Sequence, residues 1–231
     1  MTHCIGNDVV DLAAAHNRDR ARRLRFLERT LTAAERGRLS PGTDADREFA
    51  RLWSAKEAAY KALRKRDPSF VFAPRRWQVE LGSTQSRTGE REGSVTVSAD
   101  LRVAVRWRQM DDWVHCVALV GQPPLVVDEA VAQAAGLEGG EPFSEREREG
   151  FSCAESAAVR SLAKRLLRRH GAGSVEIVRA PDGHVRAPPR AYSGAMPLAG
   201  VDLSLSHDGR FVAAVIALAT GGDRTDVSAR A

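Results

Sequence analysis

The chain has 231 residues and a formal charge of +5, with 43% hydrophobic and 28% charged residues, which is ordinary for a globular protein. This length suits one large domain or two small ones, and no apolar run approaches the roughly 20 residues of a membrane span. Three cysteines without Cys-x-x-Cys spacing, and no charged-then-apolar leader, indicate a cytoplasmic protein without a membrane partner.

The first predicted element is a short buried strand over residues 4–12, CIGNDVVDL. Apolar side chains dominate it, and Gly6 allows another backbone to approach closely. Its two acidic residues are Asp8 and Asp11. Because an aspartate just after a glycine is common in turns, a capping role is the ordinary interpretation of Asp8.

A basic, helical segment over residues 18–29 follows, and Thr32 and Glu35 have the spacing of a capping box that opens the next helix. A long helix is predicted over residues 48–66, ahead of Pro68.

The long helix carries the sequence Trp-Ser-Ala-Lys-Glu-Ala-Ala-Tyr-Lys from Trp53 to Lys61. Glu57 and Lys61 are four residues apart, so they share one flank, and a surface ion pair is the common meaning of such a pair. Of the 35 basic residues only four are lysine, and three of those lie on this helix. A compact ammonium is therefore indicated at these positions rather than a guanidinium.

Strands are predicted over residues 77–81, 95–97, 103–107 and 114–120. Residues 122–142 contain three prolines and three glycines, and we interpret them as a linker with at most a short helix over residues 128–135. The predicted organisation is a first half, residues 1–121, this linker, a second half, residues 143–219, and a disordered tail, residues 220–231.

The second half repeats the order of the first. Aligning residues 151–162 with residues 52–63 without a gap places Ser156 opposite Glu57 and Arg160 opposite Lys61, so the second copy lacks the carboxylate. Conversely, the stretch Leu-Ser-Leu-Ser-His-Asp ending at Asp208 has a histidine that the first copy lacks.

Two motifs together resemble the 4'-phosphopantetheinyl transferase superfamily. Gly6-x-Asp8-x-x-Asp11 is similar to the G-x-D-[IV]-x-[ED] strand of the holo-acyl-carrier-protein synthases, and the Trp53–Lys61 stretch is similar to their helix [FW]-[SA]-x-K-E-[AS]-x-x-K. The resemblance implies an α+β fold, here a monomeric pseudodimer of two halves, each a small antiparallel sheet packed with helices. In the surfactin type the histidine comes from the first half, so the halves look exchanged here.

The activity that the resemblance implies is Mg²⁺-dependent transfer of the 4'-phosphopantetheine arm from coenzyme A to a serine of an acyl or peptidyl carrier protein, releasing 3',5'-ADP. Asp8 and Glu57 would hold the metal, since Mg²⁺ is typically bound through one or two carboxylates. Glu57, directly or through a metal-bound water, would be the base, and Lys61 would stabilise the transferring phosphate. Asp11 would orient a metal water or cap the next segment.

Coenzyme A contacts are implied for Lys56, on the nucleotide side, and for Ser206 and His207. The family's Gly-Lys-Pro appears here as the stretch Gly-His-Val-Arg-Ala-Pro over residues 183–188, so Arg186 or His184 would replace its lysine. The basic run from Arg18 to Arg25 could bind the 3'-phosphate, bind the carrier protein or be a solvated face.

Two alternatives belong to other classes. A catalytically inactive protein of this fold would bind coenzyme A or carrier domains without transfer. A nucleic-acid-binding protein would suit the pI near 9.5, but no recognition motif or aromatic platform supports it, so we expect no nucleic-acid partner. The sequence does not separate fatty-acid, polyketide and nonribosomal peptide carriers.

Overall fold

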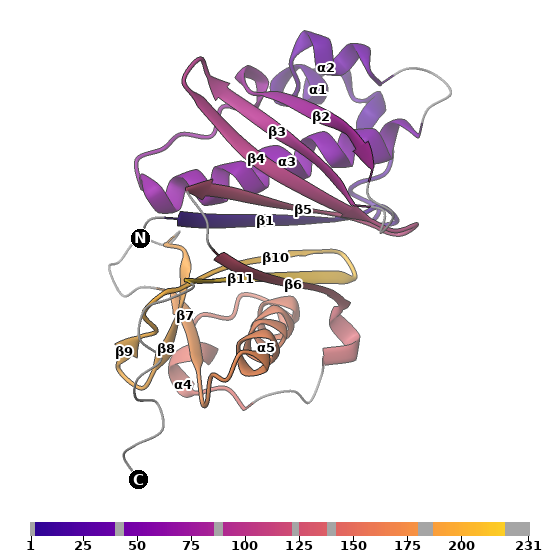
Figure 1. Ribbon diagram of the computed structural model, residues 1–231. Helices are drawn as coiled ribbons and strands as arrows, with labels where there is room; N and C mark the ends of the chain where they lie inside the picture. The colour runs from indigo at the N-terminus through magenta and orange to yellow at the C-terminus, as the bar shows by residue number, and fades with distance from the viewer. Residues whose placement is uncertain are drawn as a thin grey trace.

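The protein is built from four stacked layers, a helix, two sheets and a second helix (Figure 1). This computed structural model describes residues 3–39, 44–85, 90–121, 125–137, 142–179 and 187–219. None of the helices in this described part is long and apolar enough to span a membrane. The predicted tail, residues 220–231, lies outside the described residues.

The first half holds one five-stranded antiparallel sheet with strand order β1-β5-β4-β3-β2 and one long helix, α3. Its elements are β1 (His3–Asp11), η1 (Arg20–Arg22), α1 (Leu24–Thr30), α2 (Ala33–Gly37), α3 (Ala45–Arg66), η2 (Pro74–Arg76), β2 (Gln78–Gln85), β3 (Arg91–Ser98), β4 (Leu101–Gln109) and β5 (Trp113–Gly121).

Helix α3 lies very close to the sheet because its inner face is made of small residues. Ala55, Ala58, Ala59 and Ala62 are fully buried, and strand β1 presents Gly6 to them. A Cβ on Gly6 would stand 1.9 Å from the Ala58 carbonyl oxygen, so only glycine fits this contact. The Asp44 side chain caps the helix by accepting from the Arg47 N–H, and the helix ends at Arg66, as the sequence predicts.

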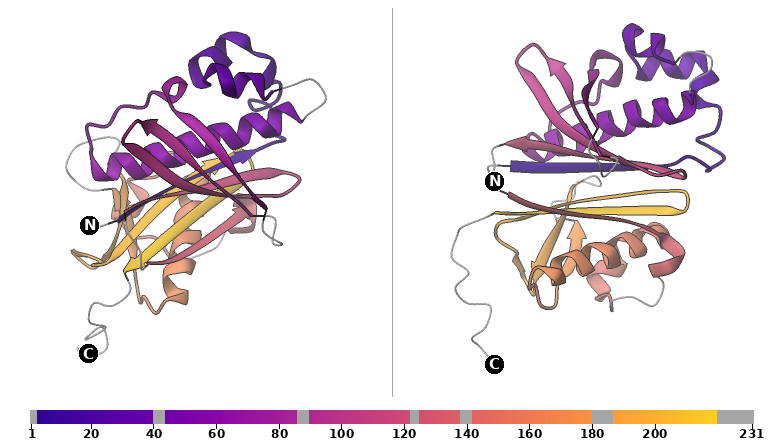
Figure 2. Two further views of the ribbon diagram at one scale, coloured as in Figure 1. Left: turned by 45° about the horizontal axis from the view of Figure 1, so that its top comes forward. Right: turned by 45° about the vertical axis from the view of Figure 1, so that its right-hand side comes forward.

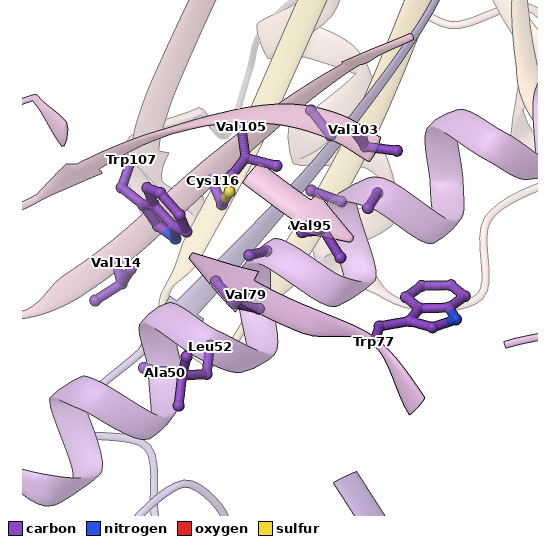
Figure 3. Packing of buried hydrophobic residues seen from close by; sticks show 14 of the residues in the cluster. Ala50, Leu52, Trp77, Val79, Val95, Val103, Val105, Trp107, Val114 and Cys116 are labelled. Atoms are coloured by element: carbon purple, nitrogen blue, oxygen red, sulfur yellow. The ribbon is translucent and has the colours of Figure 1, made fainter. Parts of the chain in front are cut away.

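The core of the first half fills the space between α3 and the sheet. Figure 3 shows valines of strands β2 to β5 in one cluster with Leu52 and Ala50 of α3, and Trp77 and Trp107 lie on opposite sides of the view. Such continuous packing makes α3 a rigid support for the polar side chains on its other flank.

The second half has a three-stranded sheet of order β10-β11-β6 and a small separate sheet, β7-β8-β9. Its elements are β6 (Leu125–Gln133), η3 (Ala134–Leu137), α4 (Glu145–Arg148), α5 (Ala154–Arg169), β7 (Glu176–Arg179), β8 (Pro189–Ser193), β9 (Met196–Pro197), β10 (Val201–Asp208) and β11 (Phe211–Ala219). Figure 2 shows α5 on the outer side of this sheet, as α3 is in the first half.

Strand β6 corrects the prediction of a linker with a short helix. Residues 125–133 pair antiparallel with the whole of β11, from the Phe211–Gln133 pair to the Ala219–Leu125 pair. The neighbouring prolines and glycines suggested a linker, but the segment itself, LVVDEAVAQ, is free of both and completes a sheet.

The internal repeat is visible in a matching buried ion pair. In the first half Lys56 of α3 bonds to Glu35, whose second oxygen accepts the Val79 N–H. In the second half Lys164 of α5 bonds to Glu147 in the same way, and Glu147 accepts the Ile177 N–H.

This correspondence corrects the gapless helix alignment. With Lys56 equivalent to Lys164, Glu57 matches Arg165 rather than Ser156, and Lys61 matches Arg169 rather than Arg160. The second copy still lacks the carboxylate.

Candidate active site

The two sheets meet along a seam between β1 and β10, where both are edge strands. Every second residue of β10 turns its side chain to the open edge of β1 and accepts a backbone N–H. Asp202 accepts from Ile5, Ser204 from Asn7, Ser206 from Val9 and Asp208 from Asp11, at 2.7–3.2 Å. The seam therefore places residues 197 apart in sequence within hydrogen-bond distance.

Asp8, Lys61 and Ser206 meet at the middle of this seam. The Asp8 carboxylate accepts hydrogen bonds from the Lys61 ammonium at 2.9 Å and from the Ser206 hydroxyl at 3.0 Å. Lys61 also lies 3.4 Å from Ser206 Oγ and donates to the Asn7 carbonyl at 2.8 Å. The three side chains come from β1, α3 and β10, so the structure brings together residues of both halves.

Glu57 lies one helical turn before Lys61 and has a strongly perturbed ionisation. Burial raises its pKa to about 7, the negative charge of Asp8 acts in the same direction, and the Lys61 ammonium opposes both. Burial also raises the pKa of Asp8. The charge and hydrogen bond of Lys61 and the hydrogen bond of Ser206 act in the opposite direction. Two carboxyl groups near one another, each disfavoured as an anion, form a site suited to a cation.

Lys65 continues the row of lysines along α3 and was not among the predicted site residues. Its ammonium donates to Asp202, to the Ile5 carbonyl and to the Leu203 carbonyl, each at 2.7 Å. Burial lowers its pKa, and the charge of Asp202 opposes that shift. Lys65 thus ties the two halves together, and its four-residue spacing from Lys61 was the signal that could have revealed it.

Lys56 has a different place from the one that the resemblance implies. Its side chain is fully buried, and its ammonium donates to Glu35 at 2.5 Å, to the Thr30 carbonyl and to the Pro74 carbonyl. All three N–H groups are therefore used inside the first half. This corrects the expectation that Lys56 faces the nucleotide.

Ser206 and His207 point to opposite faces of β10, as neighbours in a strand must. Ser206 is buried at the seam, whereas His207 is exposed on the side of α5. Burial of part of the ring lowers the pKa of His207, and the nearby Glu155 carboxylate opposes this shift.

Asp11 is held by a different set of partners from Asp8. Both of its oxygens accept from the Arg210 guanidinium, at 2.8 and 2.9 Å, and one accepts the Ala13 N–H. Although burial alone would raise its pKa, the hydrogen bonds from Arg210 and Ala13 lower it to about 2. These contacts favour the capping role over the role in orienting a metal water. Arg186 and His184 lie outside the described residues.

A cavity of about 200 Å³ opens beside this centre, between α3 and the second half. Its lining combines cationic, aromatic and small apolar side chains, namely Tyr60, Lys61, Arg64, Lys65, Arg179, Ala187, Pro188, Pro189, Ser204 and Leu205. The Arg64 guanidinium donates to the Tyr60 hydroxyl at 3.2 Å and lies near its ring, at 5.9 Å. Several cations around a cleft between halves fit a polyanionic ligand.

Arg20 is a further cation near the seam. Burial lowers its pKa, while the negative charges of Asp208 and Asp8 oppose this. Its guanidinium donates to the His16 carbonyl at 3.0 Å and lies 5.5 Å from the centre of the Phe26 ring. The sequence indicated a basic run here without distinguishing Arg20 from the exposed arginines around it.

The carboxylate pair suits Mg²⁺ in its chemistry. No group of three or more metal-binding side chains occurs within the described ranges, so a closed protein cage of the zinc type is not present there. Asp8 and Glu57 supply oxygen donors whose raised pKa values a bound cation would bring back down. Such a cation completes its coordination with phosphate and water oxygens.

Comparisons with known proteins identify the family. Residues 4–118, which include all of α3 and most of β1 and β5, match the family model described as the 4'-phosphopantetheinyl transferase superfamily. A stretch of 60 residues, 26% of the chain, is 38% identical to the holo-[acyl-carrier-protein] synthase of Rhodopirellula baltica, and the match spans about half (48%) of that relative's length. The first half, which supplies Asp8, Glu57 and Lys61, therefore places the chain in the 4'-phosphopantetheinyl transferase superfamily.

Proposed function

We propose that this protein transfers the 4'-phosphopantetheine arm of coenzyme A to a serine of an acyl or peptidyl carrier protein in a reaction that needs Mg²⁺. The observation that carries the proposal is the meeting of Asp8, Lys61 and Ser206 across the seam, beside a Glu57 whose pKa is about 7. The superfamily match and the distant synthase relative support the same class of reaction.

In this proposal the carrier serine oxygen attacks the β-phosphorus of coenzyme A. The bond from that phosphorus to the bridging oxygen breaks, and 3',5'-ADP leaves with the bridging oxygen. Glu57 takes the serine proton, directly or through a water, because it is the carboxylate that lies one helical turn from Lys61 beside the proposed metal position. Lys61 stays beside the transferring group and balances its negative charge.

Asp8 and Glu57 would hold the magnesium ion, which when bound supplies charge neutralisation for the pyrophosphate. Ser206 fixes the Asp8 carboxylate from the second half. The cavity lined by Lys61, Arg64 and Tyr60 has the charge and position to receive the nucleotide end of coenzyme A. His207 reaches the α5 side of β10, where it can contact a phosphate that extends past the strand edge.

The test is intact-mass spectrometry of apo carrier proteins incubated with the protein, Mg²⁺ and coenzyme A. A mass gain matching one phosphopantetheinyl group, lost when Mg²⁺ is omitted, is the expected result. Glu57→Gln should lower the transfer rate by roughly a hundredfold or more, since general-base catalysis contributes about 10²–10⁴-fold.

The matched control is Glu28→Gln, a change of the same kind on the exposed face of α1, and it should leave the rate unchanged. No mass gain on fatty-acid, polyketide or peptide carriers, with coenzyme A still bound, would instead identify a non-catalytic binding protein. Near-normal turnover by Glu57→Gln would remove Glu57 from the site.

A further inference from the structure

A buried polar pair interrupts the apolar packing between the two sheets. Asn7 of β1 and His115 of β5 are both fully buried. On one side of them Ile5 packs with Val215 and Ala217, and on the other Val9 packs with Phe211 and Ala213. An apolar pair at this level would fit the surroundings, so the polar pair requires its own explanation.

Asn7 alone contacts four different elements, β5, β10, β11 and α3. Its side-chain amide donates to the Ala213 carbonyl of β11 at 3.1 Å and lies 3.2 Å from His115 Nε2. Its backbone N–H donates to Ser204 of β10 at 2.9 Å, and its carbonyl accepts from Lys61 of α3 at 2.8 Å.

These contacts close a short loop around the reactive centre. Ala213 is the direct partner of Ser206 in the β10–β11 ladder. Ser206 donates to Asp8, and Asp8 follows Asn7 in the chain. Asn7 is therefore linked to Ala213, Ala213 to Ser206, and Ser206 to Asp8, the residue next to Asn7. These contacts together fix the position of β1 relative to β10.

The pair is not built for stability alone. Asn7 Oδ1 and His115 Nδ1 are buried without a hydrogen-bond partner among the described residues, an arrangement that costs stability. The second half has no such pair at the equivalent positions. When β6 and β11 are matched with β1 and β5 so that the Gln133–Phe211 pair corresponds to the Asp11–Trp113 pair, Glu129 and Ala213 are the equivalents of Asn7 and His115.

We propose that Asn7, oriented by His115, is a positioning residue that sets the register of the two halves so that Asp8, Lys61 and Ser206 meet. Buried polar groups that fix one register at some expense in stability are known from other assemblies. The expected effect on kcat rests on the proposed function. The positioning of Asp8, Lys61 and Ser206 by Asn7 does not depend on that function.

The test compares Asn7→Leu, which keeps the volume and removes the amide, with Val9→Ala, which thins the neighbouring apolar layer. Asn7→Leu should keep or raise the melting temperature while lowering kcat roughly tenfold, with KM for coenzyme A little changed, and weakening Mn²⁺ binding roughly tenfold by electron paramagnetic resonance. Val9→Ala should lower the melting temperature and leave kcat and Mn²⁺ binding within about twofold of the parent.

Conservative replacement provides the rescue. His115→Gln keeps an acceptor for the Asn7 amide and should retain most activity, whereas His115→Leu should behave as Asn7→Leu does. Because these variants alter a different strand, they decide the question even if Asn7→Leu does not fold.

A crystal structure of the leucine variant separates this inference from the proposed function. Loss of the Asp8–Ser206 hydrogen bond supports positioning whether or not any carrier is modified. An unchanged hydrogen bond with unchanged Mn²⁺ affinity would overturn it, as would activity lost only in proportion to the folded fraction. If the parent protein modifies no carrier, the proposed function fails on that result alone.

Discussion

His115 is a histidine that cannot easily take up a proton where it lies. Burial lowers its pKa to about 3, and the positive charges of Arg108, Lys61 and Arg106 add to the effect. Its ring is fully buried, and Asn7 offers it only an N–H group. The neutral ring is therefore part of the folded state.

A pH-dependent stability follows from the sign of this shift. A histidine whose pKa is lowered on folding binds its proton more readily in the unfolded chain. Acid therefore destabilises the folded protein through His115, and this destabilisation is absent above pH 6.5 and grows as the pH falls toward 3. At pH 5 the contribution of His115 lowers the free energy of unfolding by about 2 kcal/mol relative to pH 8, whereas Glu57, whose pKa is raised on folding, contributes in the opposite direction over the same range. Urea unfolding of the parent and of His115→Gln at both pH values isolates the contribution of His115.

The control for this prediction is His115→Gln, which has no ionisable group at this position. Its loss of stability between pH 8 and pH 5 should be smaller than that of the parent by the same amount. Equal losses in the two proteins would mean that another group causes the acid sensitivity.

The contact between β1 and α3 decides whether the site can form, because Asp8 and Lys61 face each other across it. Gly6→Ala would push a Cβ into the Ala58 carbonyl and the Ala62 nitrogen, at 1.9 and 2.7 Å, where the obstructing atoms are backbone. We expect a loss on the order of 3 kcal/mol in the free energy of unfolding, at the upper end of overpacking effects.

Gly37→Ala is the matched control at the end of α2. No atom outside its immediate surroundings comes within 4 Å of a Cβ placed there, so stability should change by less than about 1 kcal/mol. Thermal or denaturant unfolding of both variants tests the pair. A Gly6→Ala protein as stable as the control would show that strand and helix can separate without penalty.

Sequence patterns predicted the elements of the first half well because each has a strong local signal. The alanine- and lysine-rich helix and the apolar β1 strand appear where the sequence places them. Strand β6 was missed because its clearest evidence is the ladder with β11, whose residues lie far along the chain, from the Phe211–Gln133 pair to the Ala219–Leu125 pair.

The side chains were harder to place than the elements. Lys56 and Lys61 belong to one motif, but helical geometry sends Lys56 into the core and Lys61 to the seam. The opposite faces of Ser206 and His207 could have been predicted from strand alternation. Asn7 and Asp202 gave no signal, because their roles exist only when the two halves meet.

At the scale of the whole molecule, the repeat gives a second set of positions equivalent to those of the site. Matching the Asp11–Trp113 pair with the Gln133–Phe211 pair makes Ala130 equivalent to Asp8, and the helix correspondence makes Arg165 and Arg169 equivalent to Glu57 and Lys61. Arg169 is paired with Asp128. The two carboxylates proposed to bind the metal therefore have no carboxylate counterparts at the equivalent positions of the second half.

We accordingly expect one coenzyme A site per chain. Equilibrium dialysis with labelled coenzyme A should give a stoichiometry of one, Lys61→Met should weaken binding, and Arg169→Met should leave it unchanged. A stoichiometry of two, or weaker binding in the Arg169 variant, would show that the equivalent positions of the second half also bind the ligand.

The hydrogen bonds along the seam have a consequence for the protein during its synthesis. The open edge of β1 is made first, and the side chains that cover it arrive 197 residues later on β10. At about 5–20 residues per second, a ribosome takes roughly 10–40 s to add that length. Over that interval the nascent first half presents an unpaired strand edge, the surface on which strands of other chains can add. Completion of the last hairpin both closes this edge and brings Ser206 to Asp8 and Lys61, so we expect a chain that stalls before β10 to lack the proposed site and to be prone to aggregate.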